Sequence, residues 1–132
     1  DTGLLHFLAG LRTPQELTTW NKRGASFESL VIEELAALAA RQLVRPEIFF
    51  WRTQAGAEVD LLIIEGRRIL PVEIKLGAAV DHYVIAGLRQ CMKDLGLSRG
   101  WVVTTAQERQ RLSAGIEIIP WGDVASGRID LF

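Results

Sequence analysis

The middle of the chain contains three short runs rich in β-branched and aromatic side chains, separated by single glycines. The glycines are Gly56 and Gly66. Apolar runs of this length bounded by turn residues are typical of strands, and short connections join antiparallel neighbours. Two consecutive hairpins are therefore predicted, and they constrain the fold more than any other feature of the sequence. The predicted strands cover residues 47–53, 57–64 and 68–76.

Amphipathic helices are predicted on both sides of this segment. The first runs from about 27 to 43, where apolar residues recur at spacings of three and four, and Ser26 is its expected N-cap. The second runs from about 80 to 95, and Gly96 is a natural stop after it. Strands are predicted at 100–105 and 116–119, with a polar helical segment near 106–113 between them.

This order of elements predicts the fold class. The series α-β-β-β-α-β-α-β indicates an α/β protein with a central mixed β-sheet flanked by helices. The length of 132 residues fits a single domain over 1–132. Residues 1–25 are interpreted as an N-terminal lead-in, with a short helix or turn at 4–11 and a loop over 12–25.

Composition excludes several classes of protein. No apolar run approaches the 18 residues of a membrane-spanning helix, and no secretory signal is recognised. The net charge of −1 argues against a protein that coats nucleic acid, although a local basic rim stays compatible with it. Cys91 is the only cysteine, and its apolar helical setting predicts a buried free thiol. A cytoplasmic location is expected.

Glu28 is the first of three carboxylates in unusual positions. At 100° per residue it points along the apolar stripe of its helix, near Val31, Ile32 and Leu35. A buried carboxylate is costly unless it is paired or coordinates a metal. The alternative is a first-turn position, where water and the helix dipole stabilise an acid.

The other unusual acids lie in the predicted strands. Asp60 interrupts an otherwise apolar run and is a poor strand former, although it could also be a solvated edge residue. Glu73 and Lys75 are two apart, so they share one face of their strand. Taken alone, that pair is better explained by an ion pair on the solvent-exposed face of a half-exposed strand.

The hairpin joining the two strands favours a metal site. If Gly66 and Arg67 form a two-residue type II′ loop, Asp60 lies directly opposite Glu73. A one-residue shift would instead place Asp60 opposite Pro71. Two carboxylates facing each other destabilise a hairpin unless a cation lies between them. Mg²⁺ or Mn²⁺ is the expected cofactor, because both prefer oxygen ligands.

These residue types match metal-assisted phosphodiester hydrolysis. Asp60 and Glu73 would bind the ion, and Glu28 would complete or orient its ligand shell from the adjoining helix. A divalent ion polarises the phosphodiester and lowers the pKa of a bound water. Lys75 would orient that water and stabilise the developing charge.

The arrangement of one acid followed by Glu-x-Lys on the next strand resembles the PD-(D/E)XK nuclease superfamily. The resemblance rests on Asp60, on Glu73 with Lys75, and on the helical Glu28 upstream. It implies a restriction-endonuclease-like core with the order α-β-β-β-α-β, which agrees with the order derived above. It also implies a catalytic role for all four residues.

A closer resemblance covers nearly the whole chain. The chain is similar to the DUF4143 domain that forms the C-terminal part of prokaryotic AAA-type ATPases. That family implies an upstream ATPase domain, which is absent here because no G-x-x-x-x-G-K-[ST] phosphate loop occurs. The strings that carry the resemblance are DTGL at 1–4, FESLVIEEL at 27–35, FFWRTQAGAEVD at 49–60 and LPVEIK at 70–75.

The same resemblance suggests three substrate-binding residues. Arg52 matches a recurrent arginine before the glycine turn, where it would contact phosphate or pair with a carboxylate. Tyr83 and Gln90 lie seven apart on one side of the second helix and would match a Gln-and-Tyr pair of some nuclease branches, although their order and spacing depart from that pattern.

Two functions are carried forward. The first is a metal-dependent deoxyribonuclease, acting on DNA as part of a larger ATPase. The second is a non-catalytic module that retains the nuclease fold and binds DNA, a protein partner or its own ATPase. An RNA-directed or toxin-type nuclease is a weaker third reading, and a homo-oligomer is left open.

Overall fold

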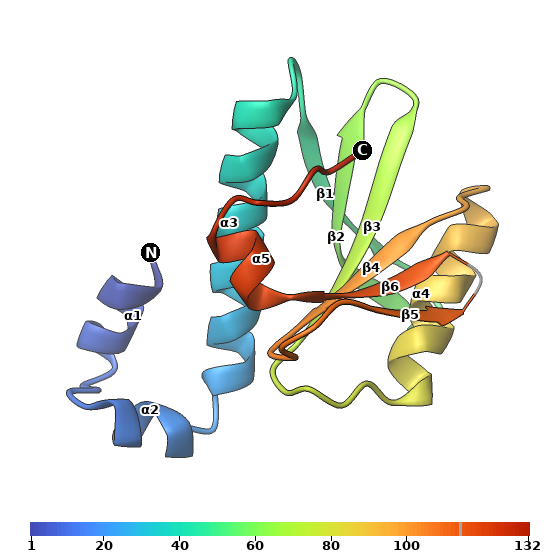
Figure 1. Cartoon of the computed structure of the whole chain (residues 1–132). Coiled ribbons are helices and arrows are strands. Elements are labelled where there is room, and N and C mark those ends of the chain that lie inside the picture. Colours follow the sequence, from blue (N-terminus) through green and yellow to red (C-terminus); the bar gives the residue numbers. More distant parts are fainter. Residues whose placement is uncertain (114) are drawn as a thin grey trace.

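The computed structural model describes residues 1–113 and 115–132 and shows one mixed sheet between two layers of helices (Figure 1). The strand order is β1-β2-β3-β4-β6-β5. Helix α3 lies on one face of the sheet and α4 on the other. The elements are α1 Thr2–Leu8, α2 Pro14–Thr19, α3 Arg23–Gln42, β1 Glu47–Arg52, β2 Glu58–Glu65, β3 Arg68–Lys75, α4 His82–Asp94, β4 Gly100–Thr104, β5 Gln110–Ser113, β6 Ile116–Pro120 and α5 Trp121–Ala125.

The predicted fold class is confirmed. Strands β1, β2 and β3 form an antiparallel meander. Strand β4 pairs parallel with β3, β6 pairs parallel with β4, and β5 pairs antiparallel with β6 at the far edge. The series α3-β1-β2-β3-α4-β4 is the expected core order. Within the described residues, no helix is long and apolar enough to cross a membrane.

Side chains that alternate along the strands form two apolar cores. On the α3 side, Leu61 and Val72 pack with Leu35 of the helix. On the α4 side, Leu62 packs with Leu88 and with the buried thiol of Cys91, as predicted. Because strands β2 and β3 are covered on both faces, a carboxylate that points off either strand enters a partly desolvated space.

Two predictions about local structure were wrong. The polar segment near 106–113 is not helical, because Gln110–Ser113 pairs with β6 as an edge strand. Residues 12–25 are not all loop, because Thr13 caps helix α2 with a capping box that Glu16 completes. The T-P-Q-E signature of a helix start was present in the sequence and was overlooked.

The start of α3 also differs from the prediction. The helix begins at Arg23, so Ser26 is a buried residue inside it and not its N-cap. The Ser26 hydroxyl lies 2.6 Å from Nε2 of His6 in helix α1. This contact ties the N-terminal segment to α3, a long-range partner that local sequence signals do not reveal.

Candidate active site

The β2–β3 hairpin has the register proposed from the sequence. Glu65 pairs with Arg68 across the turn, and Gly66 has a φ of +61°. Arg67 does not have a positive φ, which excludes a type I′ turn and agrees with type II′. Pro71 pairs with Leu62, so the shifted register that would place Asp60 opposite Pro71 does not occur.

Asp60 stands where the regular pairing of β2 and β3 ends. The paired positions run as far as Leu61 with Val72, and the next position brings Asp60 across from Glu73. There an Asp60 side-chain oxygen, Oδ2, accepts the N–H of Ile74 at 2.7 Å. The carboxylate therefore takes the place of a main-chain acceptor, which fixes its orientation beside β3.

Glu73 is the most deeply buried acid of the cluster, with 5% of its surface exposed. Its Oε1 lies 3.0 Å from Nζ of Lys75, whereas its Oε2 is buried and has no hydrogen-bond partner. Burial, together with the nearby charge of Asp60, raises the pKa of the Glu73 carboxyl to about 7 against the opposing effect of Lys75. An unpartnered buried carboxylate oxygen is unusual and calls for a proton, a water or a cation.

The carboxyl groups of Asp60 and Glu28 also have raised pKa values. Burial raises the pKa of Asp60, although the hydrogen bond from Ile74 and the charge of Lys75 oppose it. Burial and then the charge of Asp60 raise the pKa of Glu28. Glu28 thus comes from α3 to within electrostatic range of the hairpin acids.

Lys75 is the cation that this cluster surrounds. Burial alone would lower the pKa of Lys75, but its hydrogen bond to Glu73 and the charges of Glu73, Asp60 and Glu28 together raise it. Its ammonium group stays protonated at neutral pH. It can therefore donate hydrogen bonds and stabilise negative charge, but it is a poor general base.

A cavity of about 750 Å³ opens beside Glu73 and Lys75. Tyr83 and Gln90 of helix α4 line it, so two of the three suggested substrate-binding residues lie at the same opening as the Glu-x-Lys pair. Gln90 donates a hydrogen bond to Asp94 at 2.7 Å, and the Tyr83 side chain is exposed.

Glu58 is a site residue that the sequence analysis did not single out. It lines both the cavity at Glu73 and a smaller one of about 200 Å³ that Glu28 and Asp60 share. The sequence could have indicated Glu58, because it lies two residues before Asp60 on the same strand and therefore shares its face. Arg52 lies 3.7 Å from Glu58, so of its two suggested roles the structure shows the pairing with a carboxylate.

The cluster offers few ligands for a metal ion. Among residues 1–113 and 115–132, no group of three His, Cys, Asp or Glu side chains is arranged to hold one. The atoms that suit a divalent cation are Oε2 of Glu73 and the carboxylate of Asp60, since both are acidic oxygens on facing strands. The unpartnered Oε2 is the observation that fits a cation at this position.

Comparison with known families assigns the chain to a family. A family described as "Domain of unknown function (DUF4143)" matches residues 23–124. The chain belongs to the DUF4143 family. The match covers every residue of the candidate site, from Glu28 to Gln90, and it stops at α5.

Two mycobacterial relatives of this DUF4143 chain are similar along almost its whole length. They are the uncharacterized protein Rv2008c of Mycobacterium tuberculosis and the uncharacterized protein Mb2031c of Mycobacterium bovis. Each is 34% identical over 131 residues, which is 98% of this chain and 28% of the relative. The chain therefore spans little more than a quarter of the length of these relatives.

Proposed function

We propose that this DUF4143 domain is a divalent-metal-dependent nuclease that hydrolyses phosphodiester bonds, with DNA as its substrate. The observation that carries the proposal is the buried and unpartnered Oε2 of Glu73, next to Asp60 and Lys75. A fold maintained only for packing has no reason to keep a half-satisfied carboxylate beside a second one.

Each residue of the cluster has a role in this proposal. Asp60 and Glu73 hold Mg²⁺ or Mn²⁺, and Glu28 orients the shell from helix α3. When bound, the ion polarises the scissile phosphate and lowers the pKa of a water molecule. Lys75 positions that water by donating a hydrogen bond and stabilises the charge that develops on phosphate oxygens.

The resemblance to the PD-(D/E)XK superfamily supports this reading. Its Asp and Glu-x-Lys pattern falls on adjacent strands of this sheet, with a helical acid nearby. Tyr83 and Gln90 would contact substrate in the cavity beside Lys75, and Arg52 would reach phosphate only by leaving Glu58.

The partner domain belongs to the same proposal. The relatives are more than three times as long as this chain, and the family resemblance implies an AAA-type ATPase upstream of the nuclease-like part. ATP hydrolysis there would move or open DNA for cleavage at the Glu73 site.

A second candidate is a non-catalytic module that binds DNA or protein on the same fold. Three observations favour it: the described residues form no three-ligand metal group, Arg52 is engaged with Glu58, and the net charge is −1. In this case Lys75 neutralises Glu73 for the sake of the fold alone.

Cleavage of supercoiled plasmid and of single-stranded DNA, with Mg²⁺ or Mn²⁺, tests the proposal. Asp60→Asn is the sharpest variant, because an amide oxygen can still accept the Ile74 N–H while the negative charge is lost. We expect Asp60→Asn and Lys75→Met each to reduce cleavage at least roughly 100-fold. The exposed Glu108→Gln is the matched control and should cleave at the wild-type rate.

Two results would decide against the nuclease. Cleavage that survives Asp60→Asn would mean a contaminant or a different site. A folded wild-type protein that binds DNA in a salt-sensitive way, and cleaves neither substrate with either metal, would favour the binding module.

A further inference from the structure

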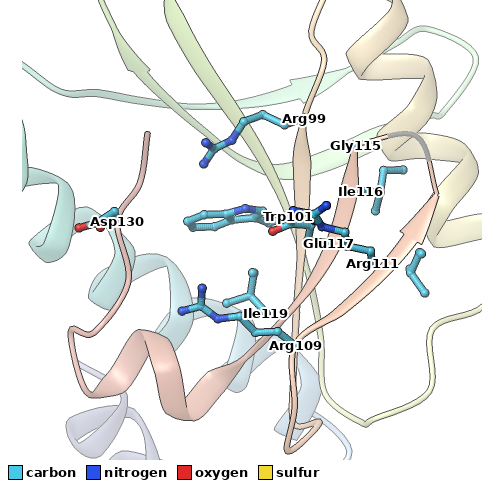
Figure 2. Close-up of a pocket in the computed structure, with 10 residues that line it drawn as sticks. Arg99, Trp101, Arg109, Arg111, Gly115, Ile116, Glu117, Ile119 and Asp130 are labelled. Atoms are coloured by element: carbon cyan, nitrogen blue, oxygen red, sulfur yellow. Dashed lines mark hydrogen bonds and ion pairs between the residues drawn. The ribbon is translucent and has the colours of Figure 1, made fainter.

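A second cavity, of about 640 Å³, lies at the other end of the sheet (Figure 2). It is open to solvent and is bordered by β4, β5, β6 and the chain that follows α5. It shares no lining residue with the cavity beside Glu73. The lining residues that matter here are Arg99, Trp101, Arg109, Arg111, Glu117 and Asp130.

Figure 2 shows how Arg99 and Arg109 are placed in this cavity. Their guanidinium groups lie on opposite sides of the Trp101 ring, and all three side chains are directed toward the segment that carries Asp130. Trp101 is 4% exposed, and the Arg99 guanidinium lies 5.5 Å from the centre of its ring. Arg99 also donates a hydrogen bond to the Leu131 carbonyl at 2.6 Å.

The other arginine contacts hold these side chains without using all their donors. Arg109 donates from Nε to Asp123 at 2.5 Å, and Arg111 donates from Nε to Glu117 at 3.2 Å. A guanidinium carries five N–H donors, and four of them are on the terminal nitrogens. Arg109 also donates from Nη2 to the Arg128 carbonyl at 3.4 Å. Both arginines are therefore anchored, and the remaining terminal N–H groups are available to a ligand.

The charges and size of the cavity define the ligand. Its lining carries three arginines against two acids, and Arg111 is paired with Glu117. Arg109 is paired with Asp123, which lies outside the lining, so both pairs would share their guanidinium groups with the ligand. Guanidinium groups arranged this way suit the oxygens of a phosphate group. A volume of about 640 Å³ lies in the range of small-molecule sites and far exceeds one phosphate ion.

We propose that this cavity binds a small phosphate-bearing molecule, of the size of a sugar phosphate or a mononucleotide. Arg109 and Arg111 bind the phosphate. The organic part lies against Trp101 and Ile119, the apolar lining residues between Arg99 and Arg109. The site is separate from the carboxylate cluster, so a failure of the nuclease proposal would not affect this one, and the reverse also holds.

Isothermal titration calorimetry on the full chain tests this site with inorganic phosphate, ribose 5-phosphate and adenosine 5′-monophosphate. We expect saturable one-to-one binding, tighter for an organic phosphate than for the inorganic ion. Arg111→Gln should weaken binding roughly tenfold, because one charge-assisted contact is lost. The Arg111 side chain is 89% exposed, so its replacement leaves the fold intact.

Two further variants sharpen the test. Asp130→Asn should strengthen binding roughly threefold, because it removes a negative charge from the lining of the cavity. Arg67→Gln makes the same change of charge as Arg111→Gln at an exposed turn outside the cavity, and should leave binding unchanged.

Three outcomes would overturn the proposal. One is the lack of saturable binding of all three probes by the folded protein. Another is equal weakening by Arg111→Gln and Arg67→Gln, which would reflect net charge alone. The third is Arg111-dependent binding of a 12-nucleotide single strand without binding of any small phosphate, which would make the cavity a nucleic-acid contact.

Discussion

Removing the charge of Glu73 should make the protein more stable at alkaline pH. The pKa of this carboxyl is raised from 4.5 to about 7 in the folded protein. The folded state therefore keeps a proton that the unfolded state releases. The stabilisation this proton provides is fully present below pH 4.5 and is lost as the pH rises through about 7.

The size of the effect follows from the pKa difference. A rise from 4.5 to about 7 corresponds to a loss of about 3 kcal/mol between those limits. Glu73→Gln removes the ionisation but also the ion pair with Lys75 at 3.0 Å, which offsets part of the gain. We expect a net gain of about 1–2 kcal/mol at pH 8, or roughly 3–8 °C in the melting temperature.

Thermal and urea unfolding at pH 5 and pH 8 measures this gain. Wild type should lose stability between the two values relative to Glu73→Gln, and the exposed Glu108→Gln should follow wild type. A constant difference between wild type and Glu73→Gln at both pH values would refute the reasoning. Addition of Mg²⁺ at pH 8 should raise the melting temperature of wild type more than that of the variant, if the ion binds at Glu73.

Three other predictions follow from single features. Lys75→Met leaves the ionised Glu73 without its cation and should lower the free energy of unfolding by roughly 1–3 kcal/mol at pH 8, measured by urea unfolding. The loss should be much smaller at pH 5, where Glu73 is protonated. Gly115→Ala should lower the free energy of unfolding by at least roughly 2 kcal/mol in the same assay. The φ of Gly115 is +83°, and an added Cβ would lie 1.9 Å from the Ser98 carbonyl oxygen. A loss below about 0.5 kcal/mol would contradict this. Burial raises the pKa of the Cys91 thiol to about 11. At pH 8 this thiol should therefore react with a thiol reagent roughly 100-fold faster in urea than in the native protein. Equal rates would be incompatible with its burial.

The hairpin and its acids were predictable because the signals are local. Gly66 fixed the turn type, and the turn fixed the register that brings Asp60 to Glu73. Two-residue periodicity placed Glu73 and Lys75 on one face, where the structure joins them in an ion pair. Both inferences depend only on the residues of the two strands and of the turn that joins them.

The features that were missed depend on partners far away in the sequence. The segment at 110–113 is polar and suited to a helix, yet it pairs with β6, where Arg111 contacts Glu117. The role of Ser26 depends on His6, a residue twenty positions earlier. The arginine cavity unites residues from 99 to 130, which no spacing rule brings together.

The bond between Asp60 and the N–H of Ile74 joins residues 14 positions apart, across one tight turn. Contacts of such short range form early, because closing a small loop costs little entropy. We therefore expect the acid pair to form together with the hairpin, on the microsecond scale typical of hairpins, and Glu28 to join it when α3 docks. In such an order the two carboxylates would face each other before α3 covers them, and Lys75, which pairs with Glu73, would offset their mutual repulsion.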